Sequence, residues 1–280
     1  MLRGPFCSKD WIGAIPEFEK AKIVMIGVGF DGTCCNFTGS RFAPPAVRLA
    51  SWALEDYSPV FDKTLDETAF FDAGDIELSP ANVKTSLAAI KANAKDIYDC
   101  GKKYFGIGGE HSVTYPAVEA CFEKYPDLAV IQFDAHTDLR NGYLDEQFSH
   151  ASVMYNIGNL IGFENIKQIG IRSGLKEEFE LAKEHNTLVE RTEQLDTIKN
   201  KKIFVTVDVD VLSVGEMPAT GTPEAGGMTF NELVDWFKYL KSMNFDIVGA
   251  DVVELTPERD FTGASTAVCA KIIRELLMIM

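Results

Sequence analysis

Short apolar runs alternate with longer stretches of helical period from about residue 22 to the C-terminus. The runs are rich in β-branched and aromatic residues, and most are apolar on both faces. This is typical of a parallel strand covered by helices on both sides, because a half-exposed antiparallel strand would alternate. The pattern predicts strands at residues 22–28, 67–73, 102–108, 128–134, 166–171, 202–208 and 245–253.

Helical periodicity fills the segments between these strands. The second predicted helix is expected to begin with Ser79 as its cap and Pro80 in its first turn. No linker, repeat or shift in composition divides the chain, so we predict a single domain over residues 1–280. The expected fold is α/β, a three-layer α/β/α sandwich with a mostly parallel central sheet. The predicted helices cover residues 44–56, 81–100, 113–124, 150–160, 175–186, 229–243 and 263–279.

Composition narrows the range of partners and locations. The chain has 280 residues, with 42 acidic and 27 basic side chains and a net charge of -15. Such a charge would repel nucleic acid and anionic membranes, so neither is expected as a partner, whereas a cationic small molecule is accommodated more easily. The six cysteines show no CxxC spacing, and neither a signal peptide nor a membrane span is indicated. A cytoplasmic location with reduced thiols is therefore predicted.

Acidic residues and histidines follow three of the predicted strands. Asp134, His136 and Asp138 follow one strand, and in near-extended chain these alternate side chains would point to the same side. Asp208 and Asp210 end a second strand in the same way, and the paired glycines of GGEHS (108–112) allow a tight turn before His111. Because the carboxyl ends of parallel strands share one edge, the three clusters are expected to meet there.

These residues suit divalent cations. The four aspartates would repel one another unless their charge were neutralised. With the two imidazoles they exceed the four ligands of a tetrahedral zinc site and include no thiolate, so two Mn²⁺ ions are the better match. Two metals about 3.5–4 Å apart can share a bridging water and lower its pKa. The cluster therefore predicts a hydrolase with two Mn²⁺ ions per subunit.

Further motifs give the chain a family resemblance. They are GGEHS (108–112), FDAHTDLR (133–140), SHASVM (149–154), VDVDVLS (207–213), ATGTPEAGG (219–227) and DVVELTP (251–257), with FDGT (30–33), GSRFAPPAVR (39–48) and DAGD (72–75) upstream. In this ordered set the chain resembles the ureohydrolase (arginase/agmatinase) family over nearly its whole length, and it is most similar to the agmatinase branch.

The resemblance implies an activity and a role for each site residue. It implies hydrolysis of agmatine to putrescine and urea, a step of polyamine biosynthesis, by attack of a metal-bridging hydroxide on the guanidinium carbon. It also implies that Glu254 binds the guanidinium group and that His150 shuttles protons, with Asp138 counted among the catalytic groups. The family suggests a homo-oligomer, a trimer or hexamer. The implied ligands of two Mn²⁺ ions are His111, Asp134, His136, Asp138, Asp208 and Asp210.

Some positions depart from the family pattern. Glu110 stands where many relatives have Asp, and Ser213 replaces the third acid of the pattern DxDxxDP. Vicinal Cys34 and Cys35 occupy a loop position where relatives usually show other small or polar residues, and they are interpreted as packing residues or as a redox-sensitive pair. His185, in a polar run, is interpreted as a surface residue at a helix end.

Several functions stay open from the sequence. Arginine, guanidinobutyrate and formimidoylglutamate are alternative substrates. In the predicted loop over residues 138–149, Arg140 and Asn141 would suit an α-carboxylate, and Asp145 and Glu146 would suit the ammonium of agmatine. The second long loop, over residues 209–228, is expected to shape the pocket. A noncatalytic metal-binding paralogue is a further alternative, and a nucleotide-binding protein is disfavoured because no GxGxxG or P-loop motif follows the first strand.

Overall fold

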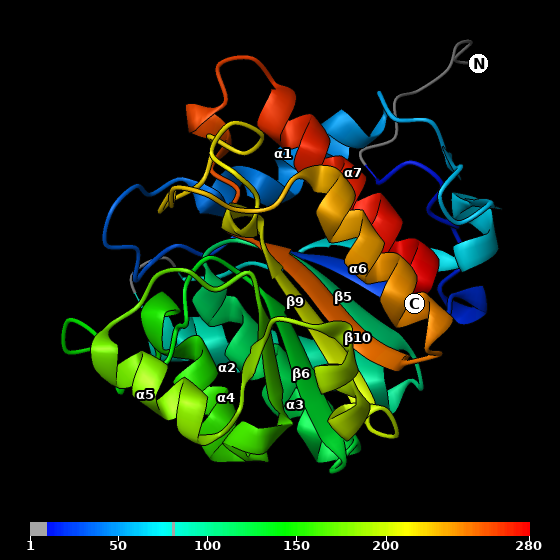
Figure 1. Cartoon of the computed structure of the whole chain (residues 1–280). Helices are drawn as coiled ribbons and strands as arrows, with labels where there is room; N and C mark the ends of the chain where they lie inside the picture. The colour runs from blue at the N-terminus through cyan, green and yellow to red at the C-terminus, as the bar shows by residue number, and fades with distance from the viewer. Residues whose placement is uncertain (1–9, 80–81) are drawn as a thin grey trace, which may run out of the picture.

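An eight-stranded sheet forms the centre of the protein, and every pair of neighbouring strands in it is parallel (Figure 1). The structure is a computed structural model that describes residues 10–79 and 82–280. The seven predicted strands are present, and an eighth, β8, consists of two residues, which is too short to produce a periodicity. In spatial order the strands are β4 (Phe70–Asp75), β1 (Ile23–Val28), β5 (Lys103–Gly108), β10 (Asp246–Val253), β9 (Lys202–Asp208), β6 (Leu128–Phe133), β7 (Ile166–Ile169) and β8 (Leu188–Val189).

Helices cover both faces of this sheet (Figure 1). On one face lie α1 (Ala43–Ser51), α6 (Phe230–Ser242) and α7 (Ala264–Ile279), and on the other α2 (Val83–Asp99), α3 (Thr114–Lys124), α4 (Val153–Ile161) and α5 (Lys176–Glu184). Each layer buries its own hydrophobic core against the sheet. The predicted single-domain α/β/α sandwich is confirmed. Among the described residues, no helix combines the length and the apolar character that crossing a bilayer requires.

Short elements connect the main ones. The strands β2 (Tyr57–Ser58) and β3 (Lys63–Thr64) form a separate antiparallel pair. The 3₁₀ turns are η1 (Phe18–Lys20), η2 (Ser40–Phe42), η3 (Leu65–Thr68), η4 (His111–Val113), η5 (His150–Ser152), η6 (Phe163–Asn165), η7 (Thr192–Ile198), η8 (Val209–Val211) and η9 (Pro257–Arg259). Of these, η4, η5 and η8 carry site residues, so the second long loop and the predicted helix at 150–160 both begin with a 3₁₀ turn.

The start of α2 differs from the prediction. Its cap is Asn82, whose side-chain oxygen accepts a hydrogen bond from the backbone N–H of Thr85 over 3.0 Å. Ser79 lies one turn earlier, and its backbone carbonyl accepts the Asn82 N–H and the Ser86 hydroxyl. Pro80 lies outside the described residues. The prediction of Ser79 as the cap was therefore wrong, because an Asx cap closer to the helix satisfies the free N–H groups.

A buried ion pair joins α1 to β4. The guanidinium of Arg48 contacts both carboxylate oxygens of Asp72, at 2.7 and 2.9 Å, and also contacts Asp75. Arg48 lies in the motif GSRFAPPAVR and the two aspartates in DAGD, so these upstream motifs serve the fold. Asp72 also accepts the backbone N–H of Trp11, which is buried. Such a bidentate pair fixes the position of α1 on the sheet.

Candidate metal centre and active site

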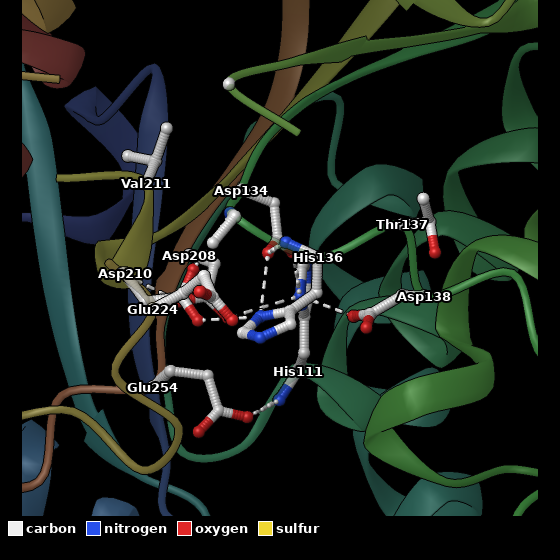
Figure 2. Close-up of polar contacts among 12 residues, drawn as sticks. His111, Asp134, His136, Thr137, Asp138, Asp208, Asp210, Val211, Glu224 and Glu254 are labelled. Carbon is white, nitrogen blue, oxygen red and sulfur yellow. Dashed lines mark hydrogen bonds and ion pairs between the residues drawn. The ribbon is translucent and has the colours of Figure 1, made fainter. Parts of the chain in front are cut away.

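Four adjacent strands at the middle of the sheet carry the site residues on their carboxyl ends (Figure 2). His111 follows β5, and Glu254 follows β10 directly. Asp208 ends β9, with Asp210 in the turn η8. The segment after β6 supplies the remaining three residues, Asp134, His136 and Asp138. The structure therefore brings the three predicted clusters together at one edge, together with Glu254.

The glycines of GGEHS were predicted to allow a tight turn, but the structure shows a different role for Gly109. Gly109 does not need a left-handed backbone. A Cβ atom on it would instead lie 1.9 Å from the backbone oxygen of Phe30. The Glu110 N–H donates to the same oxygen over 2.7 Å, so the two segments lie in direct contact. The absence of a side chain at Gly109 thereby brings FDGT (30–33) against the site.

His111 is at the centre of the first group of candidate ligands. Its Nδ1 atom lies 3.0 Å from Asp134 Oδ2, 3.1 Å from Asp138 Oδ2 and 3.5 Å from Asp208 Oδ2 (Figure 2). Among the described residues, however, no acceptor forms a hydrogen bond of ordinary geometry with this buried nitrogen. Its Nε2 atom lies 2.9 Å from the hydroxyl of Thr206. Three carboxylate oxygens that converge on one imidazole nitrogen are the arrangement expected around a cation.

His136 forms a second group beside the first. Its Nδ1 atom lies 2.9 Å from Asp210 Oδ2 and 3.6 Å from Asp134 Oδ1. Asp134 therefore contributes one oxygen to each group, with ligand atoms within 4.8 Å of one another in each. The Ala135 N–H and the side-chain amide of Gln132 donate to Asp210 and Asp134 respectively and hold the carboxylates in place.

The titration of these groups also fits a cation site. Burial and the neighbouring carboxylates raise the pKa of Asp208 well above its ordinary value. Burial, followed by the charge of Asp134, raises the pKa of Asp138 to about 6. Burial opposes the charged form of His136, yet its bonds to Asp134 and Asp210 raise its pKa to about 12. In the protein alone, protons on the histidines neutralise the carboxylates, and a divalent cation can take over this role.

Asp138, the last of the three site residues that follow β6, reaches the site by another route than predicted. Asp138 has a φ of 52°, so the chain is left-handed there and not extended as the alternation argument assumed. Its backbone carbonyl accepts the N–H groups of Met154 and Tyr155 at the start of α4, at 3.0 and 3.2 Å. The helix terminus thus holds the backbone while the Asp138 carboxylate turns to His111.

Glu254 faces the same pocket as the candidate ligands. Its φ of 70° is also left-handed, and its N–H donates to Gly109 O over 2.8 Å. Its Oε1 atom accepts the backbone N–H of His111 over 2.7 Å (Figure 2). Burial, followed by the charge of Glu110, raises the pKa of Glu254 to about 8. A cationic guanidinium would offset that burial cost and favour the ionised carboxylate.

His150 lies in the same pocket, at the start of η5. Its Nδ1 atom lies 3.2 Å from the hydroxyl of Thr33, and its Nε2 atom lies 3.4 Å from Cys35 Sγ. The ring of Tyr143 packs edge-on against it, with ring centroids 5.9 Å apart. Burial lowers the pKa of His150 to about 4, so the imidazole is neutral at pH 7. A neutral ring nitrogen can accept a proton before it donates one.

The vicinal cysteines differ in environment. Cys35 is exposed and lines the pocket, whereas burial, followed by the charges of Glu254 and Glu110, raises the pKa of Cys34. The five cysteines in the described part of the chain, Cys34, Cys35, Cys100, Cys121 and Cys269, are all unpaired. Cys7 lies outside that part. His185 caps the end of α5 and stacks on Phe163, with ring centroids 5.0 Å apart, away from the site.

Sequence reasoning did not assign a role to Glu178 or Thr33, which contact residues of the site. Glu178, in the first turn of α5, lines the pocket and accepts hydrogen bonds from the Thr137 hydroxyl and the Leu139 N–H. Its oxygen also lies 3.6 Å from Arg140 Nε. The hydroxyl of Thr33 contacts the imidazole of His150. A Glu in the first helical turn ordinarily indicates a capping box, so no local signal distinguishes Glu178.

The loop over residues 138–149 contributes fewer residues to the pocket than predicted. Arg140 lines the pocket and packs over the ring of Tyr143, with 4.6 Å from its Cζ atom to the ring centroid. Asn141 and Asp145 are exposed. Glu146 accepts the N–H of Phe148, so it caps its own loop. Of the four residues proposed to recognise the far end of a substrate, Arg140 alone is among the pocket-lining residues described.

Arg172 fixes the loop over residues 209–228. Its guanidinium donates to the backbone carbonyls of Asp210 and Ala225, at 2.7 and 2.9 Å, and to those of Val211, Leu212 and Glu224 at 3.1–3.4 Å. Ser213, which stands in place of the family's third acid, uses its backbone N–H to bond Met228 O over 2.8 Å. The loop therefore keeps its path through backbone contacts.

Known proteins share this combination of fold and site. A family model described as the arginase family matches residues 21–279. The chain belongs to the arginase family. An agmatinase from Bacillus anthracis is 41% identical over 280 residues, with 98% of this chain and 97% of that protein covered. An N(1)-aminopropylagmatine ureohydrolase from Thermococcus kodakarensis is 34% identical over 268 residues, with 91% of this chain and 88% of that protein covered.

A solved structure agrees with this placement in the arginase family. The agmatine ureohydrolase of Thermoplasma volcanium superimposes with a TM-score of 0.86, at 29% identity, covering 98% of this chain and 94% of that one. The predicted resemblance to the ureohydrolase family, most like its agmatinases, is thus confirmed. The chain is an agmatinase-like ureohydrolase, and its Asp and His groups are candidate metal ligands.

Proposed function

We propose that this arginase-family protein is a manganese-dependent agmatinase that converts agmatine and water to putrescine and urea. The observation that carries the proposal is the position of Glu254. Its carboxylate shares one pocket with His111, His136 and their aspartate neighbours. A guanidinium bound to Glu254 would present its carbon to the candidate metal groups.

The donor set fits two Mn²⁺ ions. We assign them to His111, Asp134, Asp138 and Asp208 on one side, and to His136, Asp134, Asp208 and Asp210 on the other. Carboxylate oxygens with imidazole and no thiolate suit manganese better than zinc. The Nδ1 atom of His111, surrounded by acceptors and without a well-formed hydrogen bond among the described residues, supports this assignment. Bound in this way, the metals would supply a water activated at neutral pH.

Two side chains act on the substrate. Glu254 pairs with the planar guanidinium, which fixes its orientation and neutralises its charge. His150 is neutral at pH 7 because burial lowers its pKa to about 4. It can take up a proton at a ring nitrogen and deliver it to the departing amine, so that putrescine leaves in its ammonium form.

The charge of the pocket favours a substrate without a carboxylate. Carboxylates of Asp138, Asp208, Asp210, Glu178 and Glu254 line it, and Arg140 is the one arginine or lysine among the pocket-lining residues described. Arg140 already contacts Glu178 and packs on Tyr143. An arginine substrate would need a free donor for its α-carboxylate, whereas agmatine has no carboxylate and needs no such donor. This favours agmatine over arginine, guanidinobutyrate or formimidoylglutamate.

Product release from a panel of substrates tests the proposal. Protein loaded with Mn²⁺ is incubated with agmatine, arginine, guanidinobutyrate and formimidoylglutamate, and urea or formamide is measured. We expect urea from agmatine at a kcat/KM at least about 100-fold above the other three. Equal or greater turnover of another compound would assign the site to that substrate. No turnover of any of the four, with metal bound, would support a noncatalytic paralogue instead.

The oligomeric state and the location of the protein stay predictions. A homotrimer or hexamer and a cytoplasmic location are expected from the sequence. Neither changes the chemistry proposed for the pocket, because all the residues in that chemistry come from one chain.

A further inference from the structure

The hydroxyl of Thr33 lies between the side chains of Glu110 and His150. It donates a hydrogen bond to Glu110 Oε1 over 2.5 Å, and the Thr33 backbone N–H donates to Glu110 Oε2 over 2.8 Å. On its other side, the same hydroxyl oxygen accepts the His150 backbone N–H over 3.0 Å and lies 3.2 Å from His150 Nδ1. Thr33 thus links a buried carboxylate to the proposed proton shuttle.

The number of protons in this cluster decides the state of the imidazole. A hydroxyl group has one proton to donate and two lone pairs to accept with. Glu110 is surrounded by donors, since the Ser112 hydroxyl also donates to its Oε1. The Thr33 proton is therefore used by Glu110, and the hydroxyl can offer only lone pairs to His150. One lone pair accepts the backbone N–H, so the second must accept a proton from Nδ1.

We propose that Thr33 and Glu110 are positioning residues that hold neutral His150 in the tautomer protonated at Nδ1. The inference deepens the proposed agmatinase function and rests on it. It assigns Nε2 as the ring nitrogen that exchanges protons in the pocket. This nitrogen lies beside the exposed thiol of Cys35, at 3.4 Å, and not beside a strong donor.

The tautomer has a consequence for the proton transfer. When Nε2 accepts a proton, the ring becomes an imidazolium whose Nδ1–H still points at Thr33. The Glu110 carboxylate stabilises this charge through the Thr33 hydroxyl, as a carboxylate does for a catalytic histidine in other hydrolases. The proton enters and leaves at Nε2, so no net charge is stored on His150 after a cycle. In the opposite tautomer, Nε2 would already carry a proton and could not accept another.

Two substitutions at Thr33 separate positioning from packing. Thr33→Val keeps the shape of the side chain and removes the hydroxyl, and Thr33→Ser keeps the hydroxyl and removes a methyl group. Thr68→Val is the matched control, because Thr68 is a buried threonine away from the pocket, and its hydroxyl donates to the carbonyl of Leu65 in the turn η3. The full chain with ¹⁵N-labelled histidine and Mg²⁺, a diamagnetic cation, serves for NMR.

The ring ¹⁵N shifts report the tautomer directly, and the chain has only four histidines to assign. His150→Asn identifies the signal of His150. In the wild type and in Thr33→Ser we expect protonated Nδ1 and bare Nε2, and in Thr33→Val we expect loss of this pattern. With Mn²⁺ and agmatine, Thr33→Val should lower kcat by about tenfold or more with KM changed less than about twofold, and Thr33→Ser should restore most of it.

Specific results would overturn the inference. A wild-type His150 protonated at Nε2, or a Thr33→Val spectrum unchanged from wild type, contradicts the assigned tautomer. A loss of kcat in Thr33→Val that Thr33→Ser does not restore, or that Thr68→Val shares, indicates packing alone. If the wild-type protein releases no urea from agmatine, the proposed function fails, but the NMR measurement still tests the tautomer.

Discussion

Glu254 Oε1 accepts the backbone N–H of His111 over 2.7 Å, which ties the proposed guanidinium ligand to a proposed metal ligand. The two residues are far apart in sequence and follow the neighbouring strands β5 and β10. The second oxygen, Oε2, lies beside Gly221, where an added Cβ would be 3.0 Å from it. One oxygen of Glu254 is thus fixed by the backbone, and the other is left for a ligand.

Glu254→Gln tests the role of this carboxylate. The amide oxygen can still accept the His111 N–H, so the fold and the metal groups should be retained. Loss of the charge leaves a bound guanidinium unpaired, which costs about 2–5 kcal/mol for a buried pair. We expect kcat/KM for agmatine to fall at least about 100-fold, with manganese content unchanged by elemental analysis. Near wild-type turnover would show that Glu254 does not bind the substrate.

Asp134 and Asp210 should differ in their effect on metal content. Asp134 belongs to both groups of candidate ligands and Asp210 to the second alone. Asp134→Asn is therefore expected to lose both ions, and Asp210→Asn to keep the ion bound near His111. Both should lose turnover, as should Asp208→Asn.

Elemental analysis after gel filtration measures the bound manganese. Asp145→Asn is the control, since Asp145 is exposed in the adjacent loop. It should retain about two ions per chain, the number expected for a two-metal site. Wild-type activity or full metal content in Asp134→Asn would refute the ligand assignment.

Asp251 predicts a pH dependence of stability. This residue of β10 is 1% exposed, neither of its carboxylate oxygens has a hydrogen-bond partner among the described residues, and burial raises its pKa to about 6. The folded protein therefore binds the proton more tightly than the unfolded chain, whose ordinary Asp value is 3.8. The contribution of Asp251 to the free energy of unfolding is therefore fully present at low pH, and it is lost as the pH rises from about 4 through about 6.

Asp251→Asn should remove this loss. The variant is expected to be more stable than wild type at pH 7.5, by up to about 3 kcal/mol, and equally stable near pH 4. Urea unfolding at both pH values measures the difference, with the metal concentration held constant. Asp127→Asn, at an exposed position, makes the same chemical change and should show no such difference. A variant less stable than wild type at pH 7.5 would contradict the prediction.

Cys35 should make the enzyme sensitive to thiol reagents. Its exposed sulfur lies beside His150 Nε2, so an attached group would cover that nitrogen. We expect iodoacetamide to label Cys35 before Cys34 and to abolish urea release, and agmatine to slow both. Peptide mass spectrometry locates the label. Cys100→Ser should stay sensitive and Cys35→Ser should become resistant, whereas sensitivity retained in Cys35→Ser would place the effect elsewhere.

Most of the fold could be predicted because parallel strands buried on both faces leave long apolar runs. The seven strands and the edge at which their ends meet follow from that pattern. The two-residue strand β8 leaves no such pattern, and the cap at Asn82 depended on the local path of the chain. The boundaries of helices were accordingly less accurate than their number and order.

The candidate site was predictable where its residues adjoin strands. His111, Asp134 and Asp208 follow apolar runs directly, so their positions follow from the topology. Glu178 lines the pocket from a helix terminus, and Thr33 contacts His150 from a loop, so only the folded chain brings them to the site. The left-handed backbone of Asp138 was also invisible in sequence, since the helix terminus that stabilises it lies 15 residues further on.

The contacts of Arg172 bear on how the pocket can diversify. Every residue has a backbone carbonyl oxygen. Arg172 binds those of Asp210 and Ala225, so it fixes the path of the loop without requiring particular side chains there. Side chains of this loop that are not buried, such as those of Val214, Pro218 and Thr222, can then vary while Asp210 stays in place. A family built in this way can acquire a new substrate preference by exchanging loop residues, without rebuilding its reaction centre.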